Sequence, residues 1–135
     1  MIHFRVFGTP RPQGSKRAIP TKGRPILIES GDDNLKTWRN QVAVAVREAR
    51  PEQPLTGPVW LAALFYLPAP QRRPAWPYPA KRPDIDKLLR ALLDEITGVI
   101  VVDDCQVVSV FARKEWASDD FPPGVNVYIY PGGKP

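Results

Sequence analysis

Histidine and cysteine are nearly absent from this sequence, which excludes several kinds of site. The chain has one histidine, His3, and one cysteine, Cys105. A lone cysteine forms no internal disulfide, and this pair of residues cannot build a Cys/His zinc site. We therefore expect a protein of a reducing, cytoplasmic compartment, in which His3 is structural and Cys105 is a small buried residue.

Long hydrophobic runs are missing as well. No apolar stretch approaches the roughly 20 residues of a membrane span. Strand-like alternation starts directly at the N-terminus, without a signal-peptide pattern before it. The length of 135 residues and the hydrophobic content of 43% suit one globular unit. We expect a single domain over residues 1–135 with no membrane partner.

Acidic residues are absent from two long stretches, residues 1–28 and 53–83. The net charge is +5, from 19 basic and 14 acidic residues, and the carboxylates are concentrated elsewhere in the chain. This segregation suggests a phosphate-binding surface with a localised acidic centre. A solvated basic surface without a partner is the alternative, and charge alone does not decide between them.

Hydrophobic periodicity predicts two helices, over about 33–49 and 86–96. Leucines 88, 89, 92 and 93 and Ile96 share one face of the second helix. Alternating or continuous apolar segments predict strands over 2–7, 24–29, 58–67, 106–113 and 125–130, and the Gly/Pro-rich segment 8–23 is predicted to be a loop. The sum is an α+β fold, a mixed sheet of about five strands with two helices packed on it.

Two aspartates, Asp84 and Asp86, lie where the second helix begins, within a basic segment. In extended backbone just before a helix, this spacing points both side chains the same way. Paired carboxylates resist joint ionisation unless a cation lies between them, and Mg²⁺ prefers such oxygen ligands. A metal there would activate water and hold a scissile phosphate, while the nearby Lys and Arg residues would bind the flanking phosphates.

A third carboxylate is expected from Asp103 or Asp104, directly after the apolar stretch 99–102. Because the chain must return beside the second helix after Gly98, we expect this pair to reach the N-terminal end of that helix. Asp94, about two turns down the helix from Asp86, is a weaker candidate.

Each of these carboxylates also has a purely structural interpretation. Asp84 or Asp86 could only cap the helix. Asp86, Arg90 and Asp94 have the spacing of a surface ion-pair stripe. An Asp-Asp pair before a strand is often a turn.

Residues 68–83 form a proline-rich basic loop, with six prolines in sixteen positions. That density excludes a helix or a central strand. Its candidate DNA-binding residues are Arg72, Arg73, Trp76, Lys81 and Arg82; Lys16 and Arg17 are further candidates in the acid-free N-terminal stretch. Trp76 could stack on an exposed base or fold back onto the core.

Several segments resemble the RusA family of Holliday junction resolvases. They are "DID" (84–86) opening an apolar helix, "LLDEI" (92–96) and "VVDDCQVV" (101–108). "TWRNQV" (37–42) and "GTPRPQGSKRA" (8–18) are similar to phage-type members. The resemblance extends over roughly residues 8–130.

The resemblance implies a homodimeric, Mg²⁺-dependent endonuclease, with Mn²⁺ as a substitute, that cuts four-way DNA junctions in recombination and repair. Such proteins are often encoded by phage or prophage. The family's functional aspartates correspond to Asp84, Asp86 and Asp104, with Asp103 as a further candidate ligand. A functional lysine of the family corresponds to Arg90, which keeps the charge but does not readily give up a proton. Lys87 is the nearby amine that could replace it.

The leading hypothesis is therefore a junction-resolving nuclease whose catalytic residues are Asp84, Asp86, Asp104, Arg90 and Lys87. A protein that binds branched DNA without cutting it is the alternative. An oligomeric scaffold with an incidental basic face is a third hypothesis, and its DNA binding would show no steep dependence on salt.

Overall fold

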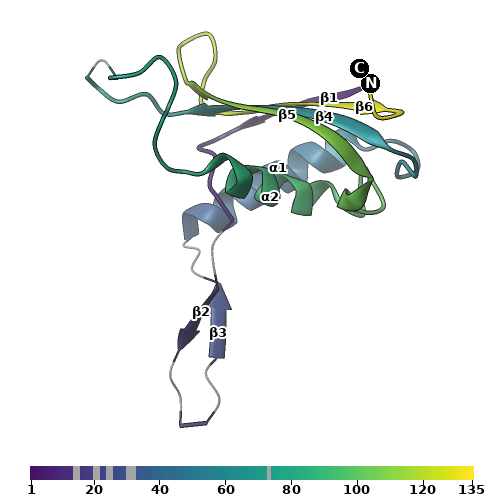
Figure 1. Ribbon diagram of the computed structural model, residues 1–135, viewed down its shortest axis with the longest axis horizontal. Coiled ribbons are helices and arrows are strands. Elements are labelled where there is room, and N and C mark those ends of the chain that lie inside the picture. Colours follow the sequence, from purple (N-terminus) through teal and green to yellow (C-terminus); the bar gives the residue numbers. More distant parts are fainter. Residues whose placement is uncertain (14–15, 20–21, 24–25, 30–32, 73) are drawn as a thin grey trace.

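The computed structural model describes residues 1–13, 16–19, 22–23, 26–29, 33–72 and 74–135, with backbone only for 16–19, 26–29 and 33. The main sheet has four strands in the order β1-β6-β4-β5. They are β1 (Ile2–Phe7), β4 (Val59–Leu67), β5 (Val107–Trp116) and β6 (Gly124–Pro131). Only β4 and β5 run parallel, so the sheet is mixed. Two helices cover one face of it (Figure 1), which confirms the α+β prediction.

A separate two-stranded ribbon accounts for the difference from the expected five strands. β3 (Ile26–Glu29) pairs antiparallel with β2 (Lys16–Ile19) and not with the main sheet. β2 lies in the segment that was predicted to be a loop. The ribbon projects away from the sheet and helices (Figure 1). The strand predicted over 24–29 is confirmed for its described residues 26–29, but its partner is another short strand; residues 24–25 lie outside the described part of the structure.

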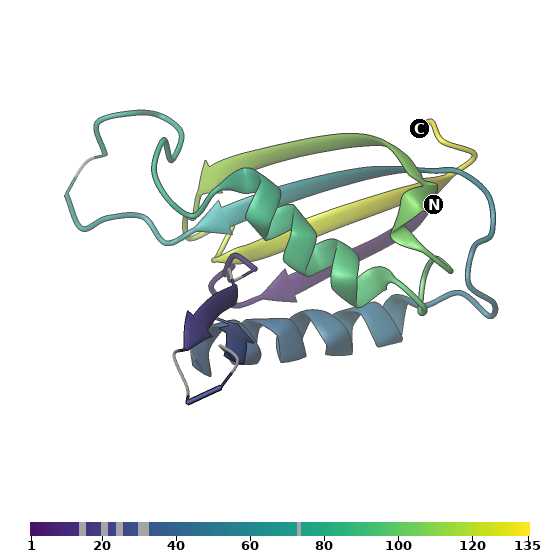
Figure 2. The same cartoon turned by 60° about the horizontal axis from the view of Figure 1, so that its bottom comes forward.

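The helices lie where the periodicity predicted them. α1 (Asp33–Ala49) buries Leu35, Trp38, Val42 and Val46, and α2 (Ile85–Ile96) buries Leu88, Ala91, Leu92 and Ile96. α1 packs on β1 and on α2, whereas α2 also contacts β5 (Figure 2). Arg39 Nε donates to Glu95 Oε1 at 3.1 Å between the two helices. Among the described residues, no helix is long and apolar enough to cross a membrane.

The chain turns sharply after α2. Gly98 has φ of 80°, a conformation that glycine adopts without steric cost. The amides of Ile100 and Val101 donate to the carbonyl of Ile96, so Val101 stays at the C-terminal end of the helix. A short 3-10 turn, η1 (Asp104–Gln106), then leads into β5.

Candidate functional site

Asp84 and Asp86 lie at the start of α2 and are both exposed. Asp84 occupies the N-cap position in extended backbone, but its side chain makes no capping hydrogen bond. Its Oδ2 lies 3.8 Å from Nζ of Lys87. Asp86 is in the first helical turn, where negative charge interacts favourably with the helix dipole. Because the capping role is not used, the Asp84 carboxylate remains available to a ligand.

Lys114 on β5 fixes the segment that leads into this aspartate pair. Its ammonium donates to the carbonyl oxygens of Lys81 (2.7 Å) and Pro83 (3.0 Å). Lys81 in turn places its Nζ 5.4 Å from the ring centre of Trp116. Lys114 was not predicted as a site residue; it lies just beyond the strand that was predicted over 106–113. A lysine in the continuation of an apolar strand was the only sequence signal.

The other face of the first turn is also anchored. The amide of Gln13 donates to the carbonyl of Lys87 at 3.0 Å. The segment after β1 therefore runs against the N-terminal turn of α2, so chain segments from both ends of the sequence hold the aspartate pair in place.

Asp103 and Asp104 lie at the opposite end of α2. The expectation that they reach its N-terminal end is wrong, because Val101 is bonded to Ile96 and only two or three residues separate it from the pair. Asp104 is close enough to Asp94 for that charge to act on its pKa. The twelve residues of α2 span about 18 Å at 1.5 Å per residue. Asp84 and Asp86 are thus separated from Asp104 within one chain.

The Asp103 side chain has a structural task. Its Oδ1 accepts from the amide of Cys105 at 2.9 Å, and Gln106 Oε1 accepts from the amide of Asp103 at 2.9 Å. This capping box matches the predicted turn alternative. The hydrogen bonds with Cys105 lower the pKa of Asp103, whereas the hydrogen bond with Asp103 raises the pKa of Asp104. Cys105 is exposed, so the expectation of a buried cysteine was wrong.

Arg90 and Asp94 are exposed on the outer surface of α2. Within the described part of the chain, no ion pair joins Arg90 to Asp86 or to Asp94. The surface ion-pair stripe is therefore not formed, and the Arg90 guanidinium is accessible to a phosphate one turn from Asp86.

The described residues contain no group of three or more His, Cys, Asp or Glu side chains that could hold a metal ion. Asp84 and Asp86 supply two carboxylates. That donor set fits Mg²⁺, which commonly uses one or two carboxylates and completes its shell with water and phosphate oxygens. It does not suit zinc, because no histidine or cysteine lies beside it.

The proline-rich loop presents its aromatic residues to solvent. Trp76 is 66% exposed, so the alternative of a core tryptophan is wrong. Trp116 Nε1 donates to the carbonyl of Trp76 at 3.1 Å, which ties the loop backbone to β5. Arg72, Lys81 and Arg82 are exposed. Arg73 and the side chains of Lys16 and Arg17 lie outside the described part of the structure.

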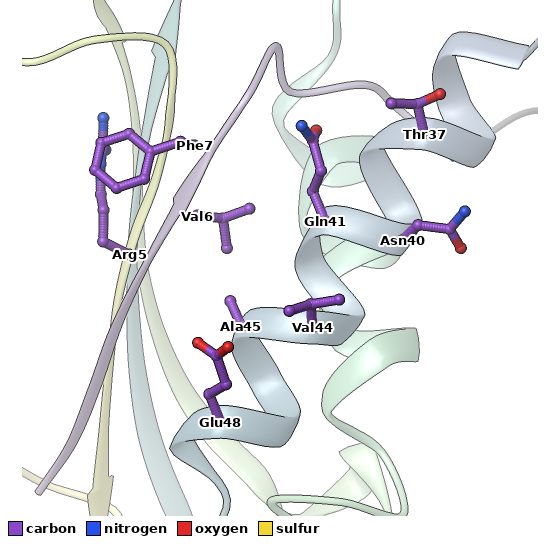
Figure 3. A pocket seen from close by; sticks show the side chains of 9 residues that line it. All are labelled: Arg5, Val6, Phe7, Thr37, Asn40, Gln41, Val44, Ala45 and Glu48. Carbon is purple, nitrogen blue, oxygen red and sulfur yellow. The ribbon is translucent and has the colours of Figure 1, made fainter.

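A shallow groove of about 480 Å³ lies between β1 and α1 (Figure 3). Val6, Gln41 and Val44 are among the residues that line it. None of the predicted site residues contributes to this groove, so the groove is distinct from the aspartate pair.

Comparison with known proteins identifies the family. The uncharacterized protein YqaN of Bacillus subtilis (strain 168) is 27% identical to this chain over 139 residues, which cover 95% of this chain and 94% of the relative. Residues 7–130, nearly the whole chain, match the family described as Endodeoxyribonuclease RusA. This match supports the predicted endonuclease activity and, with it, action on branched DNA. The chain belongs to the RusA family of endodeoxyribonucleases.

Proposed function

We propose that this protein is a homodimeric, Mg²⁺-dependent nuclease that resolves four-way DNA junctions by paired, symmetric cuts. The observation that carries the proposal is the aspartate pair at the start of α2. Asp84 and Asp86 are exposed, Asp84 makes no capping bond, and basic side chains surround them. Membership in an endodeoxyribonuclease family supports phosphodiester hydrolysis as the reaction.

Asp84 and Asp86 would hold the metal ion. When bound, Mg²⁺ supplies an activated water and neutralises charge on the scissile phosphate. Lys87 and Arg90, one turn into the helix, would bind the non-bridging phosphate oxygens and orient the phosphate. Arg90 carries a fixed charge and acts by binding alone, whereas Lys87 is the group that could also transfer a proton.

The exposed loop would hold the DNA next to the site. Arg72, Lys81 and Arg82 provide charges for the phosphate backbone, and Trp76 offers a ring for an unpaired base. A four-way junction has approximate two-fold symmetry, so a dimer with two equivalent sites suits it. A cytoplasmic location, with access to DNA, belongs to the same proposal.

A protein that binds branched DNA without cutting it is the second candidate. The separation of Asp104 from Asp84 and Asp86 within one chain favours it, because the three carboxylates do not form one cluster. The basic loop would serve either function.

A synthetic four-way junction, incubated with and without Mg²⁺, tests the proposal. We expect paired cuts only when the metal is present. Asp84→Asn, Asp86→Asn and Asp104→Asn should each abolish cutting while leaving junction affinity intact, because removing negative charge does not weaken phosphate attraction. Tight binding without any cutting by the unaltered protein would instead establish the second candidate.

A further inference from the structure

The main sheet carries a second set of binding groups on the face that the helices leave open. We propose that this open face binds a segment of single-stranded DNA, whose bases stack on aromatic rings and whose phosphates contact two arginines. The inference goes beyond the proposed nuclease function, since none of the aspartates takes part. α1 and α2 pack on the other face, and no helix or strand that the structure describes covers this one (Figure 1).

The side chains of the open face follow from strand alternation and register. On β1, Val6 is buried and points toward α1, whereas Arg5 and Phe7 lie on the other side of the strand (Figure 3). Residues opposite each other on paired strands share a face, so this side extends across all four strands. It forms four rows across the sheet: His3, Tyr128, Ala62 and Phe111; Arg5, Asn126, Leu64 and Arg113; Phe7, Gly124, Tyr66 and Glu115; and Tyr130, Trp60 and Ser109.

Aromatic side chains dominate these rows. Phe7 is 62% exposed and Phe111 is 43% exposed, and they lie on the two edge strands of the sheet. Between the edges, the rings of His3 and Tyr128 stack with their centroids 4.5 Å apart. Bases stack on such rings with little regard to sequence, and RNA-binding domains use aromatic residues on a sheet face in this way. The open face therefore suits unpaired bases, because a duplex keeps its bases stacked inside.

One row places an arginine at each edge of the sheet. Arg5 on β1 and Arg113 on β5 are three strand spacings apart, about 14 Å at the usual distance between neighbouring strands. A few nucleotides of extended single strand span this distance. The rows with His3 and Phe7 flank the arginine row on its two sides, so one strand can contact cations with its phosphates and rings with its bases.

Neither arginine is firmly neutralised by a carboxylate. Within the described residues Arg5 has no ion pair, and its guanidinium lies 5.1 Å from the ring centre of Phe7 and 4.9 Å from that of Tyr66. Its Nη1 is buried without a hydrogen-bond acceptor among those residues, which is costly unless a ligand supplies one. Arg113 Nη1 lies 3.6 Å from Glu115 Oε1, a solvent-accessible contact of the kind that contributes little. Glu115 is the only carboxylate in the four rows, so positive charge prevails there.

The open face continues into the proline-rich loop. The Arg113 guanidinium lies 5.7 Å from the ring centre of Tyr78 in that loop and 5.2 Å from that of Phe111. Trp116 Nε1 holds the carbonyl of Trp76, in the same loop, against β5. A strand that leaves the loop therefore meets Phe111 and Arg113 next. This continuity rests on the proposed DNA-binding role of the loop, and it favours DNA over a protein as the occupant of the open face.

Fluorescence anisotropy with a labelled oligothymidylate about 12 nucleotides long, in the absence of Mg²⁺, tests the site. Phe111→Ala should weaken binding at least fivefold through lost stacking, whereas Phe111→Tyr, which keeps the ring, should bind like the wild-type protein. Arg113→Gln should reduce the slope of log affinity against log salt by about 0.7. Val110→Ala is the matched control. Val110 is also 43% exposed on β5, but it pairs with the buried Leu61 on the helix side of the sheet, so its loss should leave affinity unchanged.

Photocrosslinking locates the bound strand without any substitution. An oligonucleotide that carries 5-iododeoxyuridine is irradiated with the wild-type protein, and mass spectrometry identifies the modified residues. We expect adducts on Phe7, Phe111 or Tyr128. Adducts confined to Trp76 and Tyr78 would overturn the proposal, as would a wild-type protein that does not bind the oligonucleotide. Wild-type affinity in a Phe111→Ala protein that circular dichroism shows to be folded would also overturn it.

These experiments are independent of the nuclease proposal, because they contain neither Mg²⁺ nor a junction. A protein that binds the oligonucleotide on the open face but cuts no junction would refute the nuclease function and support the single-strand site. A protein that cuts junctions but does not bind the oligonucleotide would refute the single-strand site alone.

Discussion

At the scale of single residues, Lys114 is the side chain on which the geometry of the aspartate pair depends. Its ammonium bonds two carbonyls just before α2, so Lys114→Met should lower the free energy of unfolding by about 1–3 kcal/mol. It should also raise the Mg²⁺ concentration needed for half-maximal cutting, because Asp84 is no longer held in position. Lys36→Met, at an exposed site on α1, is the control. If Lys114→Met needs the same Mg²⁺ concentration for half-maximal cutting as the wild-type protein, the lysine only stabilises the fold.

The thiol of Cys105 reports on its aspartate neighbour. The side chain of Asp103 raises the pKa of the Cys105 thiol, and only the thiolate reacts with iodoacetamide. A raised pKa means less thiolate at neutral pH, so this exposed cysteine should alkylate slowly there. Asp103→Asn removes the carboxylate that is the main cause of the raised thiol pKa. This variant should therefore alkylate faster than the wild-type protein at neutral pH, but not at strongly alkaline pH. Mass spectrometry over time measures both rates; equal rates at neutral pH would contradict the expectation.

The sequence reveals some of these residues and not others. Asp84 and Asp86 are recognisable from their short spacing at a predicted helix start, but the expectation that both lie in extended backbone before the helix was wrong, because α2 begins at Ile85 and Asp86 lies in its first turn. The turn role of Asp103 was also readable, since Gln106 three residues later completes a capping-box pattern. Lys114 was missed because alternation along a strand predicts which face a side chain occupies, but not which distant carbonyls it contacts. The placement of Asp104 failed because it depended on how far the chain travels after Gly98.

At the scale of elements, the helices and long strands were predictable because each buries one apolar stripe or face. The ribbon β2–β3 was not, because it pairs outside the main sheet and glycine and proline interrupt its sequence. The strand predicted over 24–29 was instead counted as part of the main sheet. The proline-rich loop was predicted from composition, yet its attachment to Trp116 required the structure.

The loop provides a prediction of its own through Trp76. The backbone carbonyl of Trp76, not its ring, is bonded to Trp116, so Trp76→Ala should keep the loop in place. Because the ring is exposed, we expect no loss of melting temperature, but junction binding should weaken by about 1–3 kcal/mol through lost stacking. Duplex binding should change little. Trp38→Ala is the contrasting variant, since removal of that buried ring should lower the free energy of unfolding by about 3–5 kcal/mol. Unchanged junction affinity in folded Trp76→Ala would refute the stacking role.

At the scale of the whole molecule, the basic residues near the aspartate pair form two groups that lie on different elements. Arg72, Lys81 and Arg82 belong to the proline-rich loop and its junction with α2, whereas Lys87 and Arg90 lie on the helix beside the aspartate pair. The first group should act through DNA affinity, because its exposed charges precede α2 and do not lie on the helix that carries Asp86. The second group should act mainly on the cutting step.

Salt dependence separates these two roles. Neutralising a phosphate contact releases counterions, so Arg72→Gln, Lys81→Gln or Arg82→Gln should each reduce the slope of log affinity against log salt by about one. Arg90→Gln should leave that slope nearly unchanged and instead slow single-turnover cutting at saturating protein, because Arg90 would contact the scissile phosphate. Arg47→Gln, on the last turn of α1, controls for net charge and should alter neither quantity. The measurements are junction affinities at several salt concentrations and cutting rates at saturation. Equal losses of junction affinity in the Arg72, Arg82 and Arg90 variants would contradict the division into binding and cutting residues. If the affinity of the wild-type protein does not depend on salt, the oligomeric scaffold is favoured over any nucleic-acid function.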